Sequence, residues 1–186
     1  VDGLEEYKEN ALRLGANRFE HTVQDDFKKV PGSPIAYWVS SRSRDLFTRA
    51  IPLGKVSTSA VGQNTGDNDL FLRRWFEVDL RKINFSACSR EETYTQKYKW
   101  YPYNKGGQFR KWYGNFEYVV NWQNDAEEIK KYAVVRNDGK HWSRYIQNLE
   151  FLFREGVTWS DVTSGSLSGR YLPPGFISDV SGHSAY

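Results

Sequence analysis

Apolar residues recur at helical spacing at the start of the chain. The face predicted for a helix over residues 4–16 carries Leu4, Tyr7, Ala11 and Leu14. Gly15 stands where the C-cap of such a helix is expected. A second helix is indicated near residues 24–27, and it should stop before Pro31 because proline disfavours helical geometry in the preceding residue. The sequence at residues 31–34, PGSP, predicts a turn or a rigid connector.

Residues 37–49 carry a pattern with two interpretations. Residues 37–39 start either a helix or a strand, and residues 46–47 supply its apolar partner. The polar side of this segment carries Arg42, Arg44 and Arg49. For these arginines we favour a solvated face over contact with DNA, because charged side chains are mostly exposed.

A strand-like run at residues 56–61 leads into a tight turn that contains Gly62 and Gly66. Asn68 or Asp69 is placed to cap the N-terminus of a short helix that follows the turn. That helix would carry Leu70, Phe71 and Trp75. The alternative is that the second half of this segment is a strand.

Later segments favour strands over helices. Alternating residues at 116–120 predict a half-buried strand, and an acidic start at residues 124–128 predicts a helix that continues to about Tyr132. Further strands are expected at residues 149–153, 157–162 and 176–180. The connections between these elements are an irregular segment at 79–96, a small-residue loop at 164–171 that contains Arg170, and a turn at 172–176.

The pattern as a whole predicts an α+β fold, in which N-terminal helices precede a twisted, mostly antiparallel sheet with loops. The 186 residues suit a single domain. We expect residues 1–30 to form a helical lead-in and residues 31–186 to form the mixed α/β domain.

A basic-aromatic stretch at residues 97–112 is the strongest chemical signal in the chain. Its five cations, with no acid among them, are Lys97, Lys99, Lys105, Arg110 and Lys111. Its interleaved rings are Trp100, Tyr101, Tyr103, Phe109 and Trp112. Cations between flat rings suit nucleic acid, because the charges meet phosphates and the rings meet bases. The alternative is an ordinary β-hairpin with residues 104–107 as its turn, and both can hold because binding loops commonly lie on a β scaffold.

Composition limits the other classes of function. Aromatic residues make up 16% of the chain, but its net charge is only +3, so a surface that binds anions must be local. A single cysteine, Cys88, excludes an internal disulfide, and the absence of a long apolar run leads us to expect a soluble cytosolic protein. The first residue is Val and the last six are SGHSAY, which leads us to expect a piece of a longer protein.

Motifs for metals, cofactors and catalysis are missing from the sequence. The three histidines are far apart, and Asp67 and Asp69 make an incomplete calcium loop. No glycine-rich fingerprint follows a strand and opens a helix, and neither a phosphate-binding loop nor a zinc-protease or serine-hydrolase motif occurs. The residues therefore favour a binding module, without cofactor or metal, over an enzyme.

Four segments resemble one family of enzymes. They are KKVPGSPIAYWVS at 28–40, GQNTGDNDLFLRRWFEV at 62–78, KWYPYNKGGQFRKWYGNFEYVVNWQNDAEEIK at 99–130 and FREGVTWSDVTSGSLSGRYLPPGFISDVSG at 153–182. Together they resemble the C-terminal half of PglX-like adenine-specific DNA methyltransferases of the BREX phage-defence systems. The wider group is the restriction–modification N6-adenine methylases with a TaqI-like specificity domain.

The resemblance implies a target-recognition domain that reads duplex DNA and is not itself catalytic. The family's catalytic motifs lie upstream and have no counterpart in these residues. S-adenosylmethionine is thus expected in the parent enzyme only, and the expected partners are double-stranded DNA, the upstream catalytic domain and other defence subunits, with no membrane. The DNA contacts expected from the resemblance are Lys99, Tyr103, Asn104, Lys105, Gln108, Arg110, Lys111, Trp112 and Tyr113, with Thr65 and Asn68 as second choices.

Two other interpretations stay open at this point. The chain could dock another defence subunit, or it could pack much of its aromatic surface against its own catalytic half. One conformational expectation accompanies the basic-aromatic stretch. If Gly106 or Gly107 has a positive φ, a Val at that position would strain the turn by about 1–2 kcal/mol.

Overall fold

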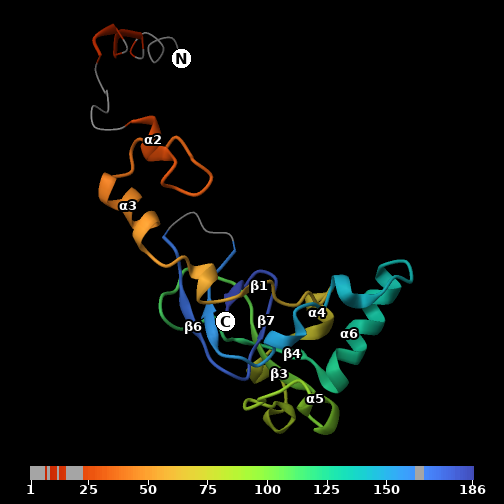
Figure 1. The fold of residues 1–186 in the computed structure, drawn as a ribbon. Helices are drawn as coiled ribbons and strands as arrows, with labels where there is room; N and C mark the ends of the chain where they lie inside the picture. Colours follow the sequence, from red (N-terminus) through yellow and green to blue (C-terminus); the bar gives the residue numbers. More distant parts are fainter. Residues whose placement is uncertain (1–6, 8, 12, 16–22, 162–165) are drawn as a thin grey trace. The chain divides into compact units, whose positions relative to one another are not determined.

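The computed structural model describes residues 7, 9–11, 13–15, 23–161 and 166–186 of the chain. It has an α+β fold and divides into two compact units, residues 1–56 and residues 57–186 (Figure 1). The predicted fold class is therefore confirmed. The expected boundary at residue 30, and the assignment of all 186 residues to one recognition domain, stay predictions.

The first unit consists of short helices joined by turns. Its elements are α2 (Gln24–Phe27), α3 (Ser41–Arg49) and the 3-10 turn η1 (Leu53–Lys55). The Ser40 side chain caps α3 by accepting a hydrogen bond from the Ser43 amide, so residues 37–39 form a turn and the helix begins later than expected. The predicted helix at 4–16 falls partly outside the described residues, but residues 9–11 are helical and Gly15 has a φ of +63°.

Arg44 corrects the expectation of a solvated arginine face in this unit. Arg42 and Arg49 are exposed, as expected, but Arg44 is only 3% exposed. Its Nη2 atom lies 3.8 Å from Oδ2 of Asp26, which stands on α2. Arg44 lies on the inner face of α3, and the Asp26 carboxylate of the neighbouring helix offsets part of its charge.

The second unit is built on two four-stranded sheets. One has the order β1-β8-β5-β6 and is antiparallel throughout; its strands are Ser59–Ala60, Ser184–Ala185, Gly156–Thr158 and Arg170–Leu172. The other has the order β2-β4-β3-β7, and only its β3–β7 pair is parallel. Its strands are Leu72–Arg74, Tyr118–Asn121, Trp100–Asn104 and Ile177–Ser178. The sequence predicted one sheet, and it did not predict β8.

Helices and 3-10 turns connect these strands. The helices of this unit are α4 (Asn68–Phe71), α5 (Glu92–Thr95) and α6 (Gln123–Arg136). The 3-10 turns are η2 (Trp75–Glu77), η3 (Leu80–Lys82), η4 (Trp142–Arg144) and η5 (Leu149–Phe151). The expected strand at 149–153 is thus wrong for its first three residues, and Arg170 belongs to β6 and not to a loop.

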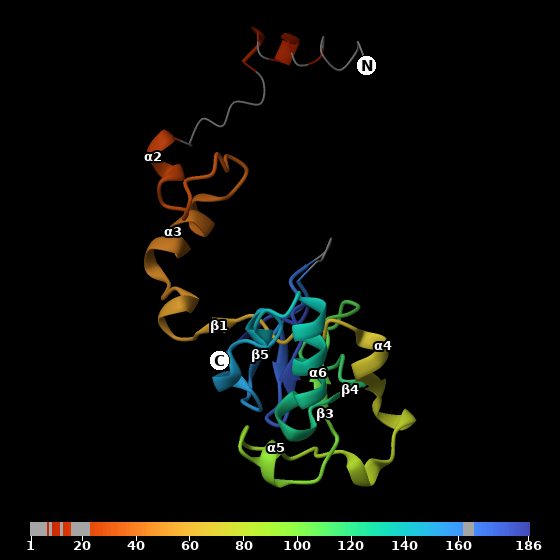
Figure 2. The same cartoon turned by 90° about the vertical axis from the view of Figure 1, so that its right-hand side faces the viewer.

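The core lies between α6 and the second sheet (Figure 2). Ile129 of α6 is fully buried, and so are Tyr101 of β3 and Val120 of β4. Val119 points to the other face of the sheet and is also buried, in a smaller cluster with Trp100. The sheet is therefore covered on both faces, which explains why β4 does not show the half-buried alternation that we expected.

A group of buried hydrogen bonds, here called the polar seam, joins the two sheets. Its members are Gln63, Tyr103, Asn104, Thr158, Ser178, Asp179 and Ser184. Asn104 of β3 donates from Nδ2 to Oγ1 of Thr158 on β5 at 2.8 Å. The hydroxyls of Ser178 and Ser184 are 3.0 Å apart and make a second link between the sheets. Buried polar groups stabilise a fold only when they are paired, so each sheet depends on the other.

The turn before α4 has a different cap from the one that we predicted. Asp67 is the N-cap residue, and its side chain accepts a hydrogen bond from the Leu70 amide at 3.1 Å. The helix ends at Phe71 and β2 covers Leu72–Arg74, so the alternative of a strand in the second half is confirmed for these three residues, and the 3-10 turn η2 follows them.

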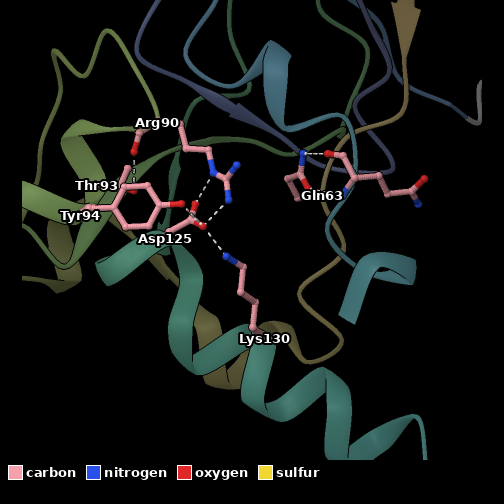
Figure 3. Close-up of polar contacts among 7 residues, drawn as sticks. Gln63, Arg90, Thr93, Tyr94, Asp125 and Lys130 are labelled. Carbon is pink, nitrogen blue, oxygen red and sulfur yellow. Dashed lines mark hydrogen bonds and ion pairs between the residues drawn. The ribbon is translucent and has the colours of Figure 1, made fainter. Parts of the chain in front are cut away.

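Asp125 carries the densest set of charged contacts in the second unit (Figure 3). Its carboxylate is 2% exposed and accepts hydrogen bonds from Arg90 at 2.6 and 2.8 Å, from Tyr94 at 2.8 Å and from Lys130. Residues 124–126 have φ values of +52° to +59°, a strained conformation for residues other than glycine, which leads the chain into α6. The carboxylate therefore fixes α5 to the start of α6.

We predict that D125N lowers the free energy of unfolding by about 3 kcal/mol at pH 7, because it leaves Arg90 and Lys130 without their acid. Burial alone would raise the pKa of Asp125, but the bonds from its partners outweigh burial and lower that pKa. Its contribution is therefore present above the unfolded pKa, near 4, and is lost as the pH falls below it.

Urea titrations of both proteins between pH 7 and pH 3 measure this effect. The difference between wild type and D125N should shrink below about pH 4. E127Q is the control, because Glu127 pairs with Lys131 at the surface of the same helix and should change stability little. A difference that stays constant down to pH 3 would contradict the assignment.

Candidate nucleic-acid interface

The basic-aromatic stretch divides between a strand and a long loop. Residues 100–104 form β3, which pairs antiparallel with β4, as the hairpin interpretation expects. The two strands are joined by residues 105–117, here called the recognition loop, and not by a tight turn at residues 104–107. Such a long connection on a rigid sheet is typical of a binding element.

The start of the recognition loop lies against the backbone of the C-terminal segment. Neither Gly106 nor Gly107 has a positive φ, so the argument from backbone strain is wrong. Gly106 is needed for another reason, since a Cβ there would collide with the carbonyl oxygen of Ser181. The absence of a side chain at Gly106 thus lets the backbone of Ser181, and not a ligand, come close to the loop.

Three further contacts hold the recognition loop in place. The Ser160 hydroxyl donates to the carbonyl oxygen of Gly107 at 3.1 Å. The Trp112 amide donates to the carbonyl oxygen of Gly169 at 3.1 Å, and the Trp112 carbonyl accepts from the Tyr171 amide at 2.9 Å. Trp112 therefore extends the first sheet beside β6 by one bridge. These three bonds use backbone atoms of the loop and do not involve its side chains.

The side chains in the middle of the recognition loop point to solvent. Exposed fractions are 56% for Phe109, 78% for Trp112 and 62% for Tyr113, and Gln108, Arg110 and Lys111 are exposed as well. Tyr and Trp side chains are enriched at interfaces, because their rings are apolar and their tips are polar. The loop therefore places rings and cations together on one accessible segment.

The five cations of the stretch divide into two groups. Lys97 and Lys99 precede β3, at the opposite end of that strand from the loop. Lys105, Arg110 and Lys111 lie in the loop itself. Lys105 is half-buried with its Nζ atom 5.3 Å from the centre of the Tyr118 ring, and Arg110 pairs with Glu117 at 3.4 Å in a solvent-exposed contact. About three of the five cations can thus serve one ligand.

A groove brings Lys105 together with a second-choice residue from the sequence, Asn68. The groove has a volume of about 320 Å³. Its lining consists of Asn68, Asp69, Leu72, Arg73, Arg74, Glu77, Lys105 and Tyr118. Arg73 and Arg74, which belong to β2, were not among the sequence-based candidates, although two adjacent cations were a usable signal. The groove carries both signs of charge, so its lining suits an anion less well than the exposed middle of the loop does.

Three predicted contact residues lie inside the protein. Tyr103 and Asn104 are fully buried in the polar seam, and Thr65 is 3% exposed with its hydroxyl donating to Oδ1 of Asn68 at 2.8 Å. Burial raises the pKa of Tyr103, and the neighbouring Asp179 carboxylate adds to the effect. In this fold none of the three side chains can reach a duplex, and we leave them out of the proposed surface.

The glycines of the turn before α4 do not form a cofactor cradle. A Cβ on Gly62 would collide with the carbonyl oxygen of Ser178, and one on Gly66 would meet the Tyr145 ring at 2.8 Å. The space beside each glycine is therefore filled by protein, and S-adenosylmethionine does not fit there. In the described part of the chain, no group of three or more acidic, cysteine or histidine side chains could hold a metal ion.

Comparison with known proteins finds two strong similarities. The chain is 42% identical over 171 residues to "Adenine-specific methyltransferase PglX" of Lacticaseibacillus casei (strain Zhang), a match that covers 91% of the chain. It is 38% identical over all 186 residues to "Adenine-specific methyltransferase BrxX" of Escherichia coli O9:H4 (strain HS). In both cases the chain spans 14% of the relative's length. No protein-family model matches the chain.

Among the residues that the structure describes, no helix has both the length and the apolar character needed to cross a bilayer.

We predict that G106A destabilises the protein by about 1–3 kcal/mol, because its methyl group must displace the Ser181 backbone. G169A is the matched control, since a Cβ there meets nothing within 4 Å and Gly169 also borders the loop. Urea unfolding of the two variants measures the difference. Equal stability of G106A and wild type would mean that the loop is not held by this contact.

Proposed function

We propose that this chain reads duplex DNA for an adenine-specific DNA methyltransferase of a BREX or restriction–modification system. The observation that carries the proposal is the recognition loop, whose backbone is fixed while its rings and cations face solvent. The similarity to two adenine-specific methyltransferases supports it. Because the chain spans 14% of those relatives, methylation itself and S-adenosylmethionine binding would belong to the remainder of the parent protein, in the cytoplasm.

The proposed contacts follow the usual division of labour at a DNA surface. Lys105, Arg110 and Lys111 would neutralise phosphates and so set affinity and register. Gln108, an exposed amide between the rings and the glycines, could reach a base edge, where amide side chains pair with adenine. Trp112 and Tyr113 would pack against sugar or base. The target adenine would be flipped into a pocket of the catalytic part.

Residues 23–56 favour a second function, the docking of protein. Ala36 is the buried apolar residue of this segment, and the exposed ones include Ile35, Tyr37, Trp38, Leu46, Phe47 and Ile51. Trp38 is 69% exposed and Phe47 is 53% exposed. An aromatic surface of this kind is typical of a protein interface. The catalytic part of the parent or another defence subunit would cover it.

We predict that changing Lys105 and Arg110 together to Ala in the full-length protein weakens binding to all duplexes alike. Three phosphate contacts from the loop give a slope of log affinity against log salt of about −3, and the double variant should lower its magnitude by about 2. The measurement is a binding titration with cognate and scrambled duplexes across a series of salt concentrations.

The matched control changes Lys131 and Lys140 to Ala, two exposed lysines on and after α6 that are not among the predicted contacts. This control should keep the slope of the wild type. If the K105A/R110A variant binds both duplexes with unchanged affinity and slope, the loop is a structural connection. The docking function would then be the better explanation of the chain.

We also predict that the isolated chain neither binds S-adenosylmethionine nor methylates DNA. The physical reason is the filled space beside Gly62 and Gly66. Calorimetry with the cofactor tests this directly, with the full-length protein as the positive control. Micromolar binding to the 186-residue chain would overturn it.

A further inference from the structure

Arg170 is a buried arginine without an acidic partner. Its residue is 1% exposed, and its Nη1 atom donates to the carbonyl oxygen of Ser168 at 3.0 Å and approaches the hydroxyls of Ser168 and Ser160 at 3.3 and 3.5 Å. Its Nε and Nη2 atoms are shielded from solvent and find no hydrogen-bond partner among the described residues. Nor does any carboxylate in those residues form an ion pair with it.

Such an arrangement is costly. An arginine keeps its proton inside proteins, so Arg170 carries a full charge at a position that is shielded from solvent. Burial lowers the pKa of Arg170, and the positive charge of Arg110 lowers it further. Buried charges are ordinarily paired, and unpaired donors of this kind call for an explanation in terms of function or a missing anion.

Several groups around Arg170 can donate a hydrogen bond to an anion, beside the carbonyl oxygens of Ser168 and Gly107. Ser160, whose hydroxyl approaches Arg170, also accepts a hydrogen bond from the Gly107 amide at 3.4 Å and donates to the Gly107 carbonyl. The backbone of Arg170 is bridged to Trp112 of the recognition loop. The site therefore combines the Arg170 guanidinium, two hydroxyls and one amide of the loop. Arg110, which pairs with Glu117 at the surface, stands in the same loop two residues before the bridge to Arg170. This set of donors matches a phosphate group.

We propose that Arg170 is the buried half of a phosphate-binding site, that Arg110 is its exposed half, and that the recognition loop covers it. The inference rests on the proposed function in one respect, because the phosphate that we expect there is a backbone phosphate of duplex DNA. Free phosphate has the same chemistry and serves as a probe.

Entry of a phosphate requires a local movement of the loop. The Gly107 end is held over Arg170 through the Ser160 hydroxyl, whose 3.4 Å bond from the Gly107 amide is long. If this end lifts, the Gly107 amide, the Ser160 hydroxyl and the free Arg170 nitrogens become available together. The ligand thus replaces one neutral hydrogen-bond pair by several charge-assisted bonds.

The first experiment is hydrogen exchange of the full-length protein in inorganic phosphate and in chloride at equal ionic strength. In the wild type, phosphate at ten times its Kd should slow exchange about tenfold in peptides that cover residues 105–112 and 166–171. R170M should lose this response, and R110M, a substitution at an exposed position, should weaken it. R170K should keep part of the response because it keeps the charge.

The outcomes decide the proposal. Equal slowing by phosphate in wild type and R170M would overturn it, and so would a response in R110M that equals that of the wild type. Exchange in chloride serves as the folding control, since R170M should match the wild type in peptides of α6 and the second sheet. If R170M fails that control, R110M decides the question alone.

A second arm separates this inference from the proposed function. Duplex binding by R170M should show a salt slope smaller in magnitude by about 0.9 than that of the wild type, for any sequence. A phosphate response that depends on Arg170 in a protein that does not bind duplex would keep the anion site and reject the DNA function. Duplex binding that depends on Lys105 and Arg110, with an unchanged slope in R170M, would do the reverse.

Discussion

The polar seam between the two sheets is the constraint on which the rest of the second unit depends. Asn104 and Thr158 are both fully buried, and the hydrogen bond of 2.8 Å between their side chains joins β3 to β5. Removing one partner of this bond would leave a buried donor or acceptor unsatisfied and lower the free energy of unfolding by about 1–3 kcal/mol. Because the recognition loop leaves β3 directly after Asn104, the seam also fixes where that loop begins.

Charged groups follow two different rules in this protein. Asp125 is buried with two cations and a tyrosine hydroxyl, so its charge is compensated and stabilises the entry to α6. In the described part of the chain, the hydrogen-bond partners of the buried Arg170 side chain are hydroxyls and a carbonyl oxygen. The Asp125 charge therefore stabilises the fold, whereas the Arg170 charge is the one for which we propose a ligand.

Local signals in the sequence were sufficient for much of the fold. The helix at residues 24–27, the turn at 172–176 and the strand at Ile177–Ser178 follow from proline, glycine and short apolar runs. The exposure of the residues from Gln108 to Tyr113 agrees with their mixture of rings and charges. These features depend on neighbours in the chain, which a reader of the sequence can see.

Long-range pairing was beyond the reach of the sequence. Tyr103 and Asn104 have polar tips that suit a binding surface equally well, and only their contacts with Asp179 and Thr158 place them inside. Arg170 looked like a loop residue because its burial depends on the recognition loop, far away in the chain. Similarly, the role of Gly106 follows from the backbone of Ser181 and not from any local turn.

The way in which the recognition loop is held determines which of its side chains can be substituted during evolution. Its hydrogen bonds at Gly107 and Trp112 are made by main-chain atoms, which every residue type possesses. The outward side chains between these attachments carry no share of the core. A descendant protein can therefore exchange those side chains one at a time, while its scaffold stays folded throughout.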